Sequence, residues 1–116
     1  MKTRMFVSSV SAVLALSLIA FFVLRTSAKS NIKSSTIEVQ VDNFSFGVGT
    51  LNVPTNSTVT WVNKDDVPHT VTSTDGLFKS KALDTDDKYA YTFTKPGTYS
   101  YYCTIHPKMV GKIVVR

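Results

Sequence analysis

Three residues near the C-terminal end of the sequence have the types and the spacing of metal ligands. Cys103, His106 and Met109 follow the pattern Cys-x2-His-x2-Met, and Cys103 is the only cysteine of the chain. A thiolate, an imidazole and a thioether are soft donors of the kind that bind copper or zinc. The spacing therefore predicts half of a metal site within one short loop.

The second imidazole that such a site needs is available upstream at His69, the only other histidine. Two imidazoles and a thiolate around the metal, with a weak axial methionine, are the ligand set of blue-copper electron-transfer sites. The sequence thus predicts one copper ion bound by His69, Cys103, His106 and Met109.

Each of these residues alone has a simpler interpretation, since a single methionine usually fills a gap in the core and a single cysteine usually behaves as a small buried hydrophobe. Four such coincidences at this spacing are implausible together. Both histidines also have a proline as neighbour: Pro68 precedes His69, and Pro107 follows His106. Proline fixes φ and stiffens the loop that holds each imidazole.

The segments that must position these residues have the pattern of β-strands, and no segment after the first 28 residues has a sustained helical period. Strands are expected at 36–41, 44–46, 51–53, 58–63, 69–72, 89–93, 98–103 and 112–115. Short strands separated by turn residues indicate an all-β fold, an antiparallel sandwich of about seven to eight strands. In the long polar segment 73–87, Leu77, Phe78 and Leu83 are expected to reach the core.

The first 28 residues are expected to lie outside this domain. A basic start, an apolar stretch over 6–24 and small residues before Ala28 are typical of a secretory signal, and the alternative is an uncleaved membrane anchor. Residues 29–35 then form a flexible tether, and 36–116 form the domain. Either interpretation places the domain outside the cytoplasm, in the periplasm or on the outer face of the membrane.

The basic charge of the chain belongs partly to this leader. Lys2, Arg4 and Arg25 lie in it, so the net charge of +5 for the whole sequence falls to +2 for the rest. The remaining basic residues form no cluster, which gives a nucleic-acid function no support. An exported chain with one cysteine forms no internal disulfide, and coordination to a metal would protect the thiol from oxidation.

Two segments of the sequence resemble the cupredoxins, the family of plastocyanin and azurin. They are VTWVNKDDVPHTV, which contains His69, and GTYSYYCTIHPKMVGKIVV, which contains the other three candidate ligands. The length of the Cys-x2-His-x2-Met loop, with proline directly after histidine, is similar to that of amicyanin. The resemblance covers nearly all of residues 36–116.

This resemblance implies a Greek-key β-sandwich with one type 1 copper ion at one end. His69, Cys103 and His106 would be equatorial ligands and Met109 the axial ligand, and the backbone N–H of Thr70 would donate to the cysteine sulfur. Many family members have asparagine at the position of Thr70, so the side-chain hydrogen bond that joins the two ligand loops is left open.

The resemblance also implies a monomeric electron carrier whose transient redox partners dock near His106, on a patch that includes Val67, Pro68 and Pro107. A copper enzyme would need additional histidine ligands, and this chain has only two. Two alternatives stay open from the sequence: a copper-binding or delivery protein with no carrier role, and a metal-free immunoglobulin-like interaction module. Zinc would also suit the donors, although the order of affinities favours copper.

Overall fold

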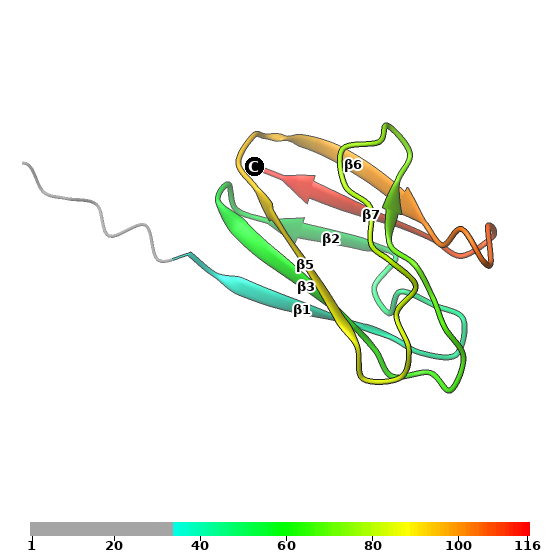
Figure 1. Cartoon of the computed structure of the whole chain (residues 1–116). Coiled ribbons are helices and arrows are strands. Elements are labelled where there is room, and N and C mark those ends of the chain that lie inside the picture. Colours follow the sequence, from blue (N-terminus) through cyan, green and yellow to red (C-terminus); the bar gives the residue numbers. More distant parts are fainter. Residues whose placement is uncertain (1–33) are drawn as a thin grey trace, which may run out of the picture. The chain divides into compact units, whose positions relative to one another are not determined.

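The computed structural model describes residues 34–116, and the structural statements below refer to that part of the chain (Figure 1). The predicted leader, residues 1–28, lies outside the described residues, as does most of the predicted tether, 29–35. The described part contains no helix, and therefore none that is long and apolar enough to cross a membrane.

Seven strands build the described part of the chain, which confirms the all-β prediction. They are β1 (Thr36–Val41), β2 (Thr50–Val53), β3 (Ser57–Asn63), β4 (Thr72–Ser73), β5 (Lys88–Phe93), β6 (Gly97–Tyr102) and β7 (Val110–Val115). Alternation of apolar and polar residues explains why they form. In β1, for example, Val39 and Val41 are buried, whereas Glu38 and Gln40 between them are exposed.

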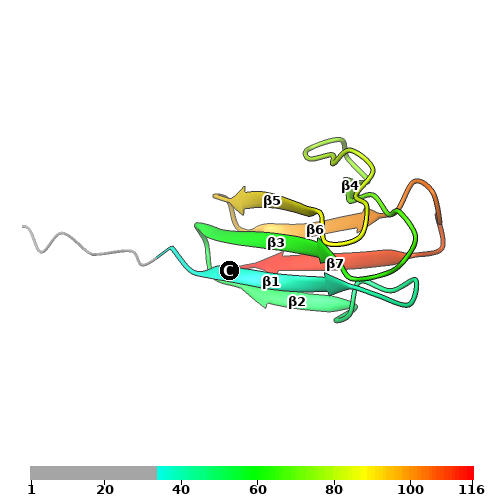
Figure 2. The ribbon, with the colours of Figure 1, turned by 60° about the horizontal axis from the view of Figure 1, so that its bottom comes forward.

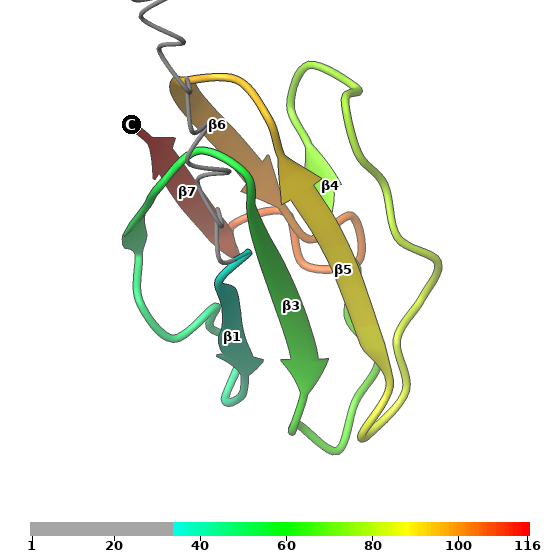
Figure 3. The ribbon, with the colours of Figure 1, turned by 90° about the vertical axis from the view of Figure 1, so that its left-hand side faces the viewer.

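The strands form two sheets that pack face to face as a sandwich. One sheet has the order β1-β3-β5, and these three strands lie side by side in Figure 3. The other sheet has the order β2-β7-β6-β4. The hydrophobic core contains side chains from both sheets, so each sheet buries its inner face against the other.

The direction of two strand pairs differs from the antiparallel arrangement that the sequence pattern predicts. β1 pairs with β3 in parallel, as does β2 with β7, and the three remaining pairs are antiparallel. After β1 the chain crosses to the other sheet, forms β2 and returns beside β1 as β3. Such a crossover brings the returning strand into the same direction as the strand it left.

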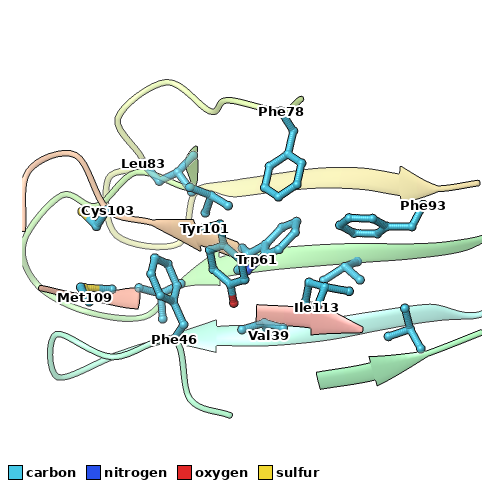
Figure 4. Packing of buried hydrophobic residues seen from close by; sticks show 14 of the residues in the cluster. Val39, Phe46, Trp61, Phe78, Leu83, Phe93, Tyr101, Cys103, Met109 and Ile113 are labelled. Carbon is cyan, nitrogen blue, oxygen red and sulfur yellow. The ribbon is translucent and has the colours of Figure 1, made fainter. Parts of the chain in front are cut away.

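Aromatic rings fill the centre of the sandwich, as Figure 4 shows. The rings of Trp61 on β3 and Tyr101 on β6 meet edge to face with centroids 5.3 Å apart, and Phe46 packs on Tyr101 at 4.7 Å. Trp61 and Val59 are both fully buried, as their shared face predicts. This core fixes β6, the strand that leads into the candidate metal ligands.

Two of the three predicted anchors in the long segment after β4 are confirmed, and one is wrong. Phe78 and Leu83 are buried, whereas Leu77 is 48% exposed. Phe78 stacks on Trp61, with ring centroids 5.8 Å apart, and so occupies the core position that Leu77 would need. Leu77 lies in a bend of the chain, and only Phe78 of the pair reaches the core.

The strand expected at 69–72 is much shorter in the structure. Only Thr72 and Ser73 pair with β6, whereas His69 forms an isolated bridge with Leu83. Both backbone hydrogen bonds of that bridge are made, at 3.1 and 2.7 Å between nitrogen and oxygen. His69 therefore lies in a loop, not in a continuous strand, and its backbone is held by the bridge to Leu83.

The loops after β1, β3 and β6 meet at one end of the sandwich (Figure 2). The loop after β3 carries His69, and the loop after β6 carries Cys103, His106 and Met109. The sandwich thus brings together two segments of the chain that lie more than 30 residues apart in sequence. This end of the molecule contains the candidate site.

Candidate metal centre

The loop that follows β6 closes on itself and directs its three candidate ligands to one end of the core. The N–H of Cys103 donates to the carbonyl of Met109 at 3.0 Å, and the N–H of Met109 donates to the carbonyl of His106 at 2.9 Å. β6 ends at Tyr102, one residue earlier than predicted, because Cys103 already belongs to this closed loop. Two backbone hydrogen bonds therefore fix the spacing of all three side chains.

Three donor atoms form a compact triangle at this end of the sandwich. The Sγ atom of Cys103 lies 3.8 Å from Nδ1 of His69 and 3.8 Å from Nδ1 of His106, and the two nitrogens are 3.2 Å apart. The point equidistant from the three atoms is about 2.1 Å from each, close to the roughly 2.0–2.3 Å that a zinc ion keeps from nitrogen and thiolate ligands. One ion of that size fits between them.

Burial differs among the candidate ligands. His69 and Cys103 are fully buried, and Met109 is 5% exposed, whereas the ring of His106 is partly open to solvent. The side chains of Cys103 and Met109 lie at the same end of the core in Figure 4. The structure thus gathers the four residues that the sequence analysis singles out, with one imidazole at the surface.

The environment of the Cys103 sulfur favours the thiolate. Burial raises the pKa of the Cys103 thiol, but hydrogen bonds to the sulfur, first among them that of the Thr70 N–H, lower it to about 6. The Thr70 N–H lies 3.3 Å from the sulfur, where the family resemblance places it. A thiolate is the form of cysteine that binds metals.

A pair of threonines joins the two ligand loops. The Thr104 N–H donates to Oγ1 of Thr70 at 2.7 Å, and the two hydroxyl oxygens are 2.8 Å apart. This answers the question that the threonine at position 70 left open: its hydroxyl accepts the hydrogen bond between the loops. The sulfur of Cys103, next to Thr104, is thereby fixed relative to His69.

Asp65 contacts His69 on the side of the ring that faces away from the sulfur. Its Oδ2 atom lies 2.9 Å from Nε2 of His69. This hydrogen bond and one from the Phe44 N–H hold the pKa of the Asp65 carboxyl at about 2. Asp65 is not among the residues predicted from the sequence, and only its position four residues before the histidine points to it.

Phe44 is a second residue of the site that sequence reasoning missed. Its ring meets both imidazoles edge to face, with centroids 5.7 Å from His69 and 4.9 Å from His106. It is nevertheless 52% exposed. The chain turns here with positive φ angles at Asn43 (47°) and Phe44 (55°). Asparagine tolerates this conformation, whereas it is rare for a bulky residue such as phenylalanine. The alternation of 44–46 predicts a strand that the structure does not form, because Phe44 lies in this turn.

Comparison with known families identifies the group to which the chain belongs. The cupredoxin-like domain family matches residues 13–115. The chain is a cupredoxin.

Known relatives of this cupredoxin include amicyanins. It is 36% identical to amicyanin of Paracoccus denitrificans over 94 residues, which is 77% of this chain and 72% of that protein. It is 30% identical to amicyanin of Paracoccus versutus over 94 residues, 77% of this chain and 71% of that protein. In both comparisons the aligned region covers more than two thirds of this chain and more than two thirds of the amicyanin.

Solved structures of similar proteins have the same fold. A mutant amicyanin in the reduced state superposes with a TM-score of 0.67 at 36% identity. The superposed region covers 70% of this chain and 82% of the amicyanin chain. A purple cupredoxin from Nitrosopumilus maritimus has a TM-score of 0.60 at 35% identity, covering 71% of this chain and 99% of that one. Other similar amicyanin structures are of the Cu(I) form.

The donor set of this cupredoxin fits copper. Two neutral imidazoles and one thiolate suit both oxidation states of the metal, and a thioether suits Cu(I) in particular. The triangle of donor atoms has room for one ion, and the low pKa of Cys103 supplies the charged ligand. The family membership also removes the basis for a metal-free immunoglobulin-like module.

Proposed function

We propose that this cupredoxin carries single electrons between partner proteins, using one copper ion bound by His69, Cys103, His106 and Met109. The observation that carries the proposal is the triangle formed by Sγ of Cys103 and the two Nδ1 atoms. Copper in such a donor set supplies a reversible change between Cu(II) and Cu(I). The protein is a carrier and not an enzyme, since this exchange forms and breaks no covalent bond of a substrate.

The residues of the site support electron transfer by keeping the donor atoms in place. His69 is held by its backbone bridge to Leu83, and Cys103 by its hydrogen bonds to Met109 and Thr70. Because the donors are fixed by the fold, their positions need change little when an electron arrives or leaves. A small rearrangement means a small barrier to electron transfer.

His106 is the candidate ligand through which electrons enter and leave. Its ring is partly exposed, and apolar side chains surround it: Ile105 is 45% exposed, Phe44 contacts the ring, and Pro68 and Pro107 are exposed. A small apolar surface without a large interface suits brief encounters with redox partners. Phe44 and Ile105 extend the docking patch that the sequence analysis assigned to Val67 and the two prolines.

The proposed place of action is outside the cytoplasm. Residues 1–28 have the composition of a secretory leader, 29–35 form the tether, and 36–116 form the exported domain. Protein recovered from the periplasm should begin near residue 29. If the leader is instead retained, residues 6–24 hold the domain at the membrane, and the protein fractionates there with an intact N-terminus.

The test of the function is the spectrum of the copper-loaded protein. With Cu(II) the wild type should be intensely coloured through a thiolate-to-copper band, and Cys103→Ser should lose that band. Met109→Leu should keep the colour and raise the reduction potential, because it removes only the weak axial donor. Fast electron self-exchange supports the carrier, whereas a blue protein with slow self-exchange would support copper delivery instead. A colourless wild type contradicts both.

A further inference from the structure

Asp65 is the one charged side chain that forms a hydrogen bond with a candidate copper ligand in the described part of the chain. Its Oδ2 atom lies 2.9 Å from Nε2 of His69, and both side chains are buried. An ionised carboxylate has no proton to donate, so Nε2 must be the donor. The Nδ1 atom of His69 then keeps its lone pair, and that atom lies 3.8 Å from the cysteine sulfur.

The carboxylate is itself held by hydrogen bonds on both oxygens. The Phe44 N–H donates to Oδ2 at 3.1 Å, and the Asp66 N–H donates to Oδ1 at 3.0 Å. The Oδ2 atom of Asp65 therefore accepts hydrogen bonds from His69 and from the backbone of Phe44, whose ring contacts both imidazoles. The position of His69 and the position of the Phe44 cover are linked through this atom.

The backbone of Asp65 is fixed as well. Its N–H donates to Oδ1 of Asn63 at 2.9 Å, and its carbonyl accepts the hydroxyl of Thr85 at 2.7 Å. The amide of Asn63 also donates to the carbonyls of Val67 and Leu83 at 2.9 and 2.8 Å. Leu83 is the residue that bridges to the backbone of His69. Asp65 is thus held rigidly from several sides, which a merely solvated acid would not need.

We propose that Asp65 is a positioning residue that fixes His69 as the Nε2–H tautomer and, through its negative charge, lowers the reduction potential of the bound copper. This inference rests on the function proposed above. A carboxylate that accepts from the outer nitrogen of a ligand histidine sets its orientation and makes it a stronger donor. A stronger nitrogen donor with a carboxylate charge beside it stabilises Cu(II) relative to Cu(I).

The test compares two substitutions that remove the same charge from neighbouring residues. Asp65→Asn keeps an oxygen for the His69 and Phe44 N–H groups but removes the charge. Asp66→Asn is the matched control, because Asp66 is exposed and no hydrogen bond joins its side chain to either histidine of the described chain. Thermal unfolding of the metal-free proteins checks that both variants fold.

In the copper-loaded protein, Asp65→Asn should shift the equilibrium toward Cu(I) by about tenfold, a rise in reduction potential of about 59 mV for one electron. The copper affinity should fall by roughly tenfold or more. Asp66→Asn should change the equilibrium by less than about twofold, as expected for a screened surface charge. Equal shifts in the two variants, or no shift in Asp65→Asn, would overturn the proposal.

A second measurement separates this proposal from the proposed function. Nitrogen NMR of the metal-free wild type should show His69 as a single tautomer with the proton on Nε2, and Asp65→Ala should show a mixture. A wild type with the proton on Nδ1 overturns the role of Asp65, whatever metal binds. A colourless copper-treated wild type with the expected tautomer contradicts the carrier and the effect on potential but leaves the positioning of His69 supported.

Discussion

The chemistry of single residues explains why Cys103 is ready to bind a metal. Burial of its sulfur alone would favour the protonated thiol, but hydrogen bonds to the sulfur, first among them that of the Thr70 N–H, favour the thiolate. The same contacts place both Nδ1 atoms 3.8 Å from the sulfur. The site is therefore organised and charged before a metal arrives.

A pH titration of the metal-free protein tests this arrangement. The pKa of Cys103 falls from its ordinary 9.0 to about 6. Ionisation of the thiol therefore stabilises the folded state fully above pH 9, and this contribution is lost as the pH falls through 6. The ultraviolet absorbance of the thiolate should rise with a midpoint near pH 6, and Cys103→Ala should show no such step. A midpoint near 9 would show that the hydrogen bonds are not made.

The threonine clamp between the ligand loops gives a second prediction at this scale. Thr70→Val keeps the shape of the side chain but leaves the Thr104 N–H without its acceptor, so the free energy of unfolding should fall by about 1–3 kcal/mol. Thr70→Ser keeps the hydroxyl and should change it far less. Urea denaturation of the metal-free proteins measures both. Equal stability of the valine and serine variants would mean that the clamp contributes nothing.

At the scale of elements, the pairing of β6 with β7 holds the ligand loop. Gly111 on β7 lies opposite Tyr101 on β6. A Cβ atom at this glycine would overlap the Tyr101 ring, which is buried against Trp61 and Phe46. The missing side chain thus lets the tyrosine fill the core directly beneath the candidate site.

Gly111→Ala should therefore destabilise the protein by about 1–3 kcal/mol, the usual effect of forcing extra volume into a packed core. Gly49→Ala is the control, because a Cβ atom there meets nothing within 4 Å. Its effect should stay within about 0.5 kcal/mol. Chemical denaturation distinguishes the two, and a harmless Gly111→Ala would contradict the packing described for Tyr101.

The alternation of apolar and polar residues predicted most of the strands. It failed where contacts with residues distant in sequence determine the backbone conformation. The alternation in 36–41, 58–63 and 89–93 is visible in the residues themselves, and these strands form. The expected strand at 69–72 is mostly absent because His69 pairs with Leu83, a contact that no local pattern contains. The strand expected at 44–46 is likewise absent, because Phe44 lies in a turn and its N–H donates to a carboxylate 21 residues away.

The candidate ligands could be predicted from the sequence, whereas the residues that support them could not. The types and spacing of Cys103, His106 and Met109 reveal their chemistry directly. Asp65 and Phe44 belong to types that usually mean solvation and packing, so only their contacts show what they do. Sequence thus indicated which atoms can hold a metal, and the structure added what orients and covers them.

At the scale of the whole molecule, the two ends of the sandwich differ. One end carries the donor atoms and the exposed apolar residues around His106, and in Figure 4 the opposite end of the core is marked by Phe93. Leu77, also exposed, lines a small cleft with Phe93 and Lys95. Electron transfer between molecules should therefore depend on the apolar surface around His106 and not on the one around Leu77.

Electron self-exchange measures this difference. Ile105→Lys places a positive charge beside His106, so two identical molecules repel at the docking patch, and the rate should fall by roughly tenfold or more. Leu77→Lys adds the same charge at a residue of similar exposure on the other surface and should leave the rate nearly unchanged. Line broadening in mixtures of reduced and oxidised protein gives both rates. An equal fall in both variants would move the docking surface away from His106.

The central claim is that one copper ion lies between the Cys103 sulfur and the two imidazoles. X-ray absorption spectroscopy at the copper edge of the loaded wild type tests it most directly. The account predicts one short sulfur ligand and two nitrogen ligands, with the sulfur signal absent in Cys103→Ser. A copper ion with only nitrogen and oxygen ligands in the wild type would contradict it.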